Sequence, residues 1–108
     1  CGGVRAALEE ARLGLVDNWL RHISDVAAHH REELAKISNL DAKVNRLCEF
    51  NVFEQAVNVC QTTMVQKAWS RGQALRVHAW IYDLKDGLLK DLGFNAGNAQ
   101  EFQMSIRQ

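Results

Sequence analysis

The chain contains no proline, carries no net charge and has only three cysteines. Each of these features makes some classes of protein less compatible with the sequence. The absence of proline suits a mostly helical chain, because proline interrupts helices. The balance of 13 Lys and Arg residues against 13 Asp and Glu residues argues against binding to nucleic acid or to an anionic membrane. No stretch approaches the roughly 18 consecutive apolar residues of a membrane-spanning helix, and nothing resembles a secretory signal. We therefore expect a cytoplasmic protein.

The cysteines are too few, and odd in number, to form a disulfide framework, and no two make a C-x-x-C pair. Reduced thiols are the expectation. Cys48 and Cys60 fall on or beside helical apolar stripes, where a free thiol is an ordinary packing residue. Cys1 opens the chain in place of methionine, which predicts a processed chain or a piece of a longer sequence.

The composition is that of a globular protein. Apolar residues make up 47% of the 108 positions and charged residues 24%. This length predicts one small domain at most, or part of a larger one.

Helical periodicity dominates the first 72 residues. Apolar residues three, four and seven apart predict one helix face from Leu13 to Ile37. A second helix is expected from Ser38 or Asn39, either of which can cap it, to about Cys60. Thr63 and Gln66 have capping-box spacing and predict a third helix through Trp69, which Gly72 ends in a left-handed conformation.

After Gly72 the apolar period changes to two. Residues 75–82 alternate as a strand does, 83–87 resemble a turn with Asp83, Lys85 and Asp86 in it, and 88–92 predict a short second strand. Residues 93–98 are expected to form a loop, followed by a weak helix. Because an isolated hairpin is marginal in water, this pattern predicts an incomplete α/β domain whose other strands lie upstream.

Five segments carry a resemblance to a known family, namely 1–4 (CGGV), 14–20 (GLVDNWL), 47–52 (LCEFNV), 68–72 (AWSRG) and 77–92 (VHAWIYDLKDGLLKDL). In this order, and over nearly the whole chain, they resemble the C-terminal half of β-class carbonic anhydrases. The family usually has glycine at the position of Ala79, away from the metal motif.

The resemblance implies a fold and a reaction. Residues 1–108 would form the C-terminal portion of a single α/β domain, in which helices flank a mainly parallel sheet. The complete enzyme would use Zn²⁺ to interconvert CO2 with bicarbonate and a proton. It would assemble as a homodimer or homotetramer.

The resemblance also assigns residues. Cys1 matches the second zinc-ligand cysteine of a His-x-x-Cys-Gly-Gly motif, and the backbone N–H of Gly2 would donate to a substrate oxygen. The other zinc ligands would lie upstream, so we expect no activity from this segment alone. Tyr82 matches the tyrosine of an inhibitory bicarbonate site, whose tryptophan and arginine lie outside this chain.

Other interpretations compete with these. Cys1 is also compatible with a lipid-modified terminus or with an N-terminal nucleophile. His22, His29 and His30 could suggest a surface metal site, but partial exposure without a metal is the simpler expectation. His78 and Trp80 are expected to pack against helices or a partner subunit. For the whole chain, the alternative function is a non-catalytic helical interaction or oligomerisation module.

Overall fold

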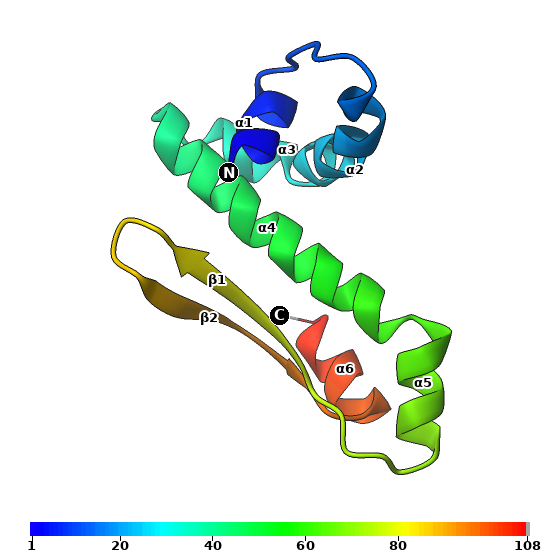
Figure 1. Ribbon diagram of the computed structural model, residues 1–108. Helices are drawn as coiled ribbons and strands as arrows, with labels where there is room; N and C mark the ends of the chain where they lie inside the picture. The colour runs from blue at the N-terminus through cyan, green and yellow to red at the C-terminus, as the bar shows by residue number, and fades with distance from the viewer. Residues whose placement is uncertain (108) are drawn as a thin grey trace. The chain divides into compact units, whose positions relative to one another are not determined.

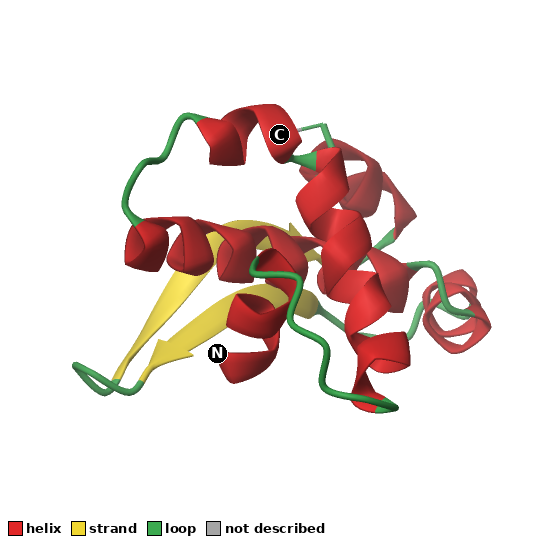
Figure 2. Cartoon of the chain, turned by 90° about the horizontal axis from the view of Figure 1, so that it is seen from above, coloured by secondary structure: helices red, strands yellow, loops and turns green. Residues whose placement is uncertain are grey.

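The computed structural model describes residues 1–107, which form helices and one β-hairpin (Figures 1 and 2). The elements are α1 Gly2–Leu8, α2 Val16–His29, α3 Arg31–Ala35, α4 Leu40–Cys60, α5 Thr63–Ser70, β1 Val77–Asp83, β2 Leu88–Ala96 and α6 Ala99–Ser105. The chain divides into two compact units, Cys1–Asn51 and Val52–Gln108, and α4 contributes residues to both.

The unit Cys1–Asn51 has its own apolar core. Helices α1 to α4 contribute to one buried cluster formed by Val4, Val26, Leu34, Val44, Leu47 and Phe50. Burying a large apolar side chain stabilises a fold by about 1.5–3 kcal/mol. The side chain of Asn39 accepts a hydrogen bond of 3.0 Å from the Ala42 N–H, so the expected cap of the second long helix is confirmed.

The prediction of one helix across 13–37 is wrong. Helix α2 ends at His29, and α3 begins at Arg31, with His30 between them at φ −114° and ψ 25°. The His30 ring stacks on Phe50, with centroids 3.8 Å apart and ring planes 6° from parallel. Apolar spacing continues across the break because both sides contribute to the same core, so periodicity alone cannot show it.

The joint between α4 and α5 also differs from the sequence prediction in its details. Thr62, not Thr63, is the N-cap: its backbone is extended at ψ 150°, and its hydroxyl oxygen accepts from the Val65 N–H at 3.4 Å. Gln66 donates to the Cys60 carbonyl at 2.6 Å rather than completing a capping box. Gly72 has φ +74°, which confirms the left-handed stop.

Strands β1 and β2 form an antiparallel hairpin in which Val77 pairs with Ala96 and Tyr82 with Leu89. The prediction that β2 ends at Leu92 and a loop follows is wrong, because the strand passes through a bulge and continues to Ala96. The register shifts opposite His78 and Trp80, and Gly93 has φ +88° there. A single glycine inside a strand pattern therefore marks a bulge rather than an end.

The turn predicted at residues 83–87 and the helix predicted near the C-terminal end are both present. The carboxylates of Asp83 and Asp86 accept from the backbone N–H groups of Lys85 and Leu88, each at 2.9 Å, as turn residues do. The helix expected in the tail is present as α6.

The unit Val52–Gln108 has a second apolar core. It consists of Ala56, Cys60, Ala79, Phe94, Ala96 and Phe102. Phe53 meets Phe94 edge to face, with centroids 5.4 Å apart. Ala79, at a position where the family that the sequence resembles usually has glycine, is fully buried in this cluster.

The mixed α/β class is confirmed, and within residues 1–107 the sheet is one antiparallel pair. The mainly parallel sheet that the resemblance implies is therefore not formed by these residues. None of the helices described for residues 1–107 combines the length and apolar character needed to cross a bilayer.

Candidate functional site

Cys1 lies at the start of α1 with its side chain exposed and its thiol free. It occupies the N-cap position, and its carbonyl accepts from the Arg5 N–H at 3.0 Å. The side chain makes no capping hydrogen bond. The sulfur is therefore accessible to a ligand.

The two glycines after Cys1 have different surroundings. A Cβ built on Gly2 would meet no atom of the described chain within 4 Å. A Cβ on Gly3 would lie 3.2 Å from Cδ2 of Leu20 and 3.8 Å from the Cys1 sulfur. The absence of a side chain at Gly3 thus lets α1 pack closely against Leu20 of α2 beside the thiol.

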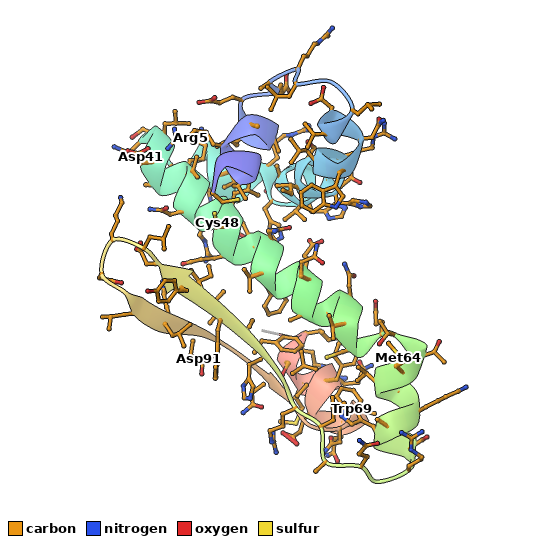
Figure 3. All side chains as sticks on the ribbon, viewed as in Figure 1. Arg5, Asp41, Cys48, Met64, Trp69 and Asp91 are labelled. Atoms are coloured by element: carbon orange, nitrogen blue, oxygen red, sulfur yellow. The ribbon has the colours of Figure 1, made fainter. Side chains whose placement is uncertain are left out.

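Helix α1 is also fixed to α4. The Arg5 guanidinium donates to the Asp41 carboxylate at 2.6 Å, and the two side chains lie side by side in Figure 3. The hydrogen bond to Asp41 raises the pKa of Arg5 above its ordinary value. Val4, 2% exposed, anchors the same turn in the first core. Sequence reasoning missed Arg5, since a pair 36 residues apart has no periodic signal.

Cys1 is the thiol that this chain offers to a metal. Cys60 is buried, and burial raises the pKa of its thiol, while Cys48 packs against the first core, so both are packing residues as predicted. Among residues 1–107, no three His, Cys, Asp or Glu side chains lie where they could hold a metal ion. A thiolate suits zinc, but zinc sites need at least three protein ligands. The described chain therefore provides one fitting ligand and an incomplete site.

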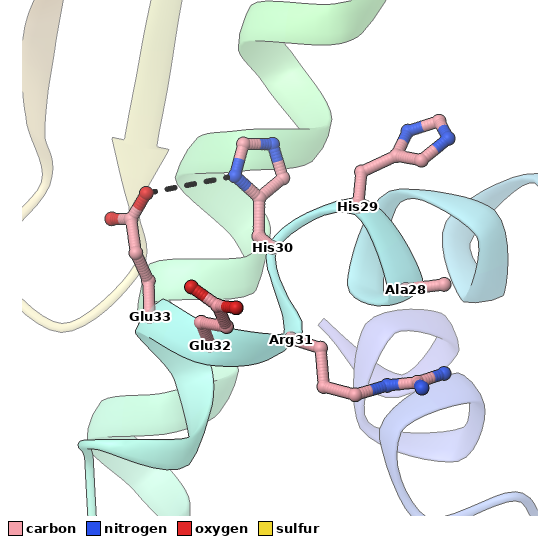
Figure 4. Close-up of a pocket in the computed structure, with 6 residues that line it drawn as sticks. All are labelled: Ala28, His29, His30, Arg31, Glu32 and Glu33. Atoms are coloured by element: carbon pink, nitrogen blue, oxygen red, sulfur yellow. Dashed lines mark ion pairs between the residues drawn. The ribbon is translucent and has the colours of Figure 1, made fainter.

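The predicted partial exposure of the histidines is confirmed. His22 and His29 are exposed and His30 is half-buried. A pocket of about 370 Å³ includes His29, His30, Glu32 and Glu33 in its lining (Figure 4). There His30 Nδ1 lies 3.9 Å from a Glu33 carboxylate oxygen. The pocket thus contains the contact between His30 and Glu33 and the stacked His30 ring, and residues 1–107 offer no set of three metal-binding side chains.

Tyr82 lies on the outward face of the hairpin with His78 and Trp80, and its side chain is 57% exposed. Its hydroxyl lies near the turn, 3.7 Å from where a Cβ of Gly87 would be. The His78 and Trp80 rings contact each other at 4.9 Å, and Trp80 stays 49% exposed. Helices of the described chain therefore leave both residues exposed, and packing against a partner subunit, the other part of the expectation, stays a prediction.

Comparisons with known proteins agree on one family. The family model for carbonic anhydrase matches residues 1–89. A carbonic anhydrase of Emericella nidulans is 44% identical over 95 residues, which are 88% of this chain and 42% of that protein.

Solved structures give the same result. A Coccomyxa β-carbonic anhydrase in complex with acetazolamide aligns over 100% of this chain and 49% of its own, with a TM-score of 0.91 and 30% identity. A structure from a study of two tetrameric β-carbonic anhydrases of Sordaria macrospora aligns over 89% of this chain and 49% of its own, with a TM-score of 0.81 and 33% identity. This chain spans less than half the length of each of these relatives, and it belongs to the β-carbonic anhydrase family.

Proposed function

We propose that this chain contributes the second zinc-ligand cysteine of an enzyme that reversibly hydrates CO2 to bicarbonate and a proton. The observation that carries the proposal is the position of Cys1. Its thiol is exposed and free. Cys1 also belongs to the family match, which covers residues 1–89. Zinc, when bound, would lower the pKa of a water molecule towards about 7 and so provide a nucleophile at neutral pH.

The chain's own residues would have two roles. Cys1 would hold the metal as a thiolate, the form of cysteine that binds zinc. The Gly2 N–H lies in the first turn of α1, where helix geometry leaves N–H groups without an acceptor in the helix. It would donate to the substrate oxygen on which negative charge develops.

The same geometry supports inactivity of this segment in isolation. Because residues 1–107 lack a three-ligand set, the remaining zinc ligands would come from the longer protein. The family resemblance implies a histidine three residues before Cys1 and, further upstream, a Cys-x-Asp-x-Arg segment, and these would complete the site.

Replacing Cys1 by Ser in the full-length protein tests the assignment. We expect loss of stoichiometric zinc, measured by elemental analysis, and loss of CO2 hydration, measured by stopped flow. Cys48→Ser is the matched control, since Cys48 packs against the first core, and it should keep both. Retention of zinc and hydration by Cys1→Ser would contradict the assignment.

We also propose that the full-length protein is a homodimer or homotetramer in the cytoplasm. Large apolar side chains remain exposed in the isolated chain, among them Leu15 at 89%, Trp19 at 70% and Tyr82 at 57%. Exposed apolar patches commonly mark protein interfaces, and the related Sordaria macrospora enzymes are tetrameric. Analytical ultracentrifugation of the full-length protein measures its assembly state, and cell fractionation measures its location.

The alternative is a non-catalytic helical interaction or oligomerisation module. The same exposed apolar side chains favour it, as does the incomplete ligand set of residues 1–107. It predicts that the full-length protein assembles but contains no stoichiometric zinc and hydrates no CO2. The zinc analysis described above separates the two functions.

A further inference from the structure

Gly3 lies between the exposed Cys1 and Leu20 of the neighbouring helix α2. A Cβ at this position would lie 3.2 Å from Cδ2 of Leu20, which is closer than ordinary van der Waals contact. Leu20 is 5% exposed, so its side chain has little room to retreat. A methyl group on Gly3 would therefore press on Leu20 and require the contact between α1 and α2 to give by a few tenths of an ångström.

The Cys1 sulfur is part of the same contact. The sulfur lies 3.8 Å from the position of that Cβ, and Ile23 Cδ1 of α2 lies 3.9 Å from the same Cβ position. The thiol therefore lies beside the contact that the first turn of α1 makes with Leu20 and Ile23. A shift of that turn would carry the sulfur with it.

The rest of α1 cannot follow such a shift freely. Arg5 is held by Asp41 of α4 at 2.6 Å, and Val4 is buried in the first core. The helix is thus fixed near its middle while its N-terminal turn carries the sulfur. Displacement caused by a methyl group at Gly3 would be concentrated at Cys1.

From these contacts we propose that Gly3 is a positioning residue, which orients the Cys1 thiolate toward zinc by letting α1 rest directly on Leu20. This inference rests on the proposed function, because it takes Cys1 to be a zinc ligand. Residues that orient a metal ligand typically contribute about 10- to 100-fold to metal affinity.

The test uses the full-length protein and the variants Gly3→Ala and Gly2→Ala. Both add one methyl group to the same turn and raise helix propensity, but a Cβ at Gly2 meets nothing within 4 Å in the described chain. Zinc affinity is measured by competition with a chromophoric chelator, and the thiolate-to-metal charge-transfer band is recorded after loading with Co²⁺. We expect Gly3→Ala to weaken zinc binding about ten-fold or more and to shift the band. Gly2→Ala should bind zinc as the wild type does.

A Leu20→Ala background keeps the test decisive even if Gly3→Ala alone fails to fold. Without the Leu20 side chain the added methyl group meets only ordinary contacts, so Gly3→Ala should leave zinc affinity in this background unchanged. Wild-type affinity and spectrum in Gly3→Ala would overturn the proposal, as would equal weakening by Gly2→Ala or continued weakening in the Leu20→Ala background. Cys1→Ser separates the two claims: if it retains zinc the proposed function fails, whereas if it loses zinc while Gly3→Ala binds normally, only the positioning role fails.

Discussion

Gln66 reaches back across the joint between α4 and α5 to donate a hydrogen bond of 2.6 Å to the backbone carbonyl of Cys60. A helix leaves its last four carbonyl groups without partners inside the helix, and this contact satisfies one of them. The adjoining Thr62 hydroxyl donates to the Val59 carbonyl at 2.7 Å and accepts from the Val65 N–H. Side chains therefore provide hydrogen-bond partners for backbone groups both at the end of α4 and at the start of α5.

Removal of the Thr62 hydroxyl should destabilise this joint. We expect Thr62→Ala to lower the free energy of unfolding by about 1 kcal/mol, because the cap of α5 is lost. Urea unfolding followed by circular dichroism measures the change. Thr63→Ala is the matched control and should change stability by less than about 0.5 kcal/mol. The reverse order would mean that Thr63, which the sequence pattern favours, is the true cap.

The N-cap of α5 shows which features of a helix a local sequence pattern predicts and which it does not. Thr63 followed by Gln66 has the spacing of a capping box, but the backbone at Thr62 is the extended one, so the actual cap is one residue earlier. The existence of the helix was predictable from local pattern. Its boundary depends on which residue leaves the helical conformation, and the spacing of Thr63 and Gln66 does not show that.

The break at His30 and the bulge at Gly93 have the same explanation. The His30 ring stacks on Phe50, a residue 20 positions away, and Gly93 takes its role from pairing between strands. Neither contact is periodic in sequence. The exposed position of Cys1 agrees with the zinc-ligand role that the family resemblance implies, whereas the packing of Gly3 on Leu20 has no signal in the sequence pattern.

Cys60 should make stability depend on alkaline pH. Burial raises the pKa of this thiol above its ordinary value of 9.0, so the folded protein holds the proton more tightly than the unfolded chain does. The resulting stability is fully present below the unfolded pKa and is lost as the pH rises through the folded pKa. We expect the free energy of unfolding to fall as the pH rises above that ordinary value of 9.0, and to fall less steeply in Cys60→Ala.

Cys48→Ala is the control for this pH dependence because it removes a thiol but leaves Cys60 in place. The decline should persist in that variant. Urea unfolding at several alkaline pH values provides the comparison. An identical slope in Cys60→Ala and in the wild type would show that other groups cause the decline.

Phe94 should be among the most sensitive core positions of the unit Val52–Gln108. Its side chain is fully buried, and its ring contacts Phe53 edge to face and lies 6.5 Å from the ring of Phe102. Phe94→Ala removes these contacts and leaves a cavity, so we expect a loss of about 3–5 kcal/mol in the free energy of unfolding. Leu84→Ala, at a side chain that is 89% exposed, should stay within about 0.5 kcal/mol of the wild type. Similar losses for both variants would contradict the assignment of this core.

Tyr82 is the position at which bicarbonate inhibition can be tested in the full-length protein. Its side chain is 57% exposed on the outward face of the hairpin, so the hydroxyl can reach an anion. Tyr82→Phe keeps the ring and removes the donor. A hydrogen bond to a charged group is worth about 1.5–3 kcal/mol, so the bicarbonate concentration that halves activity should rise about ten-fold or more.

The measurement is CO2 hydration over a range of bicarbonate concentrations, with each variant normalised to its own activity without added bicarbonate. Leu84→Ala is the control, because it alters an exposed side chain two residues away without removing a hydrogen-bond donor. Its inhibition curve should match that of the wild type. If Tyr82→Phe also gives the wild-type curve, or if the wild type is not inhibited at all, Tyr82 has no regulatory role and its exposure reflects an interface with another part of the protein or another subunit.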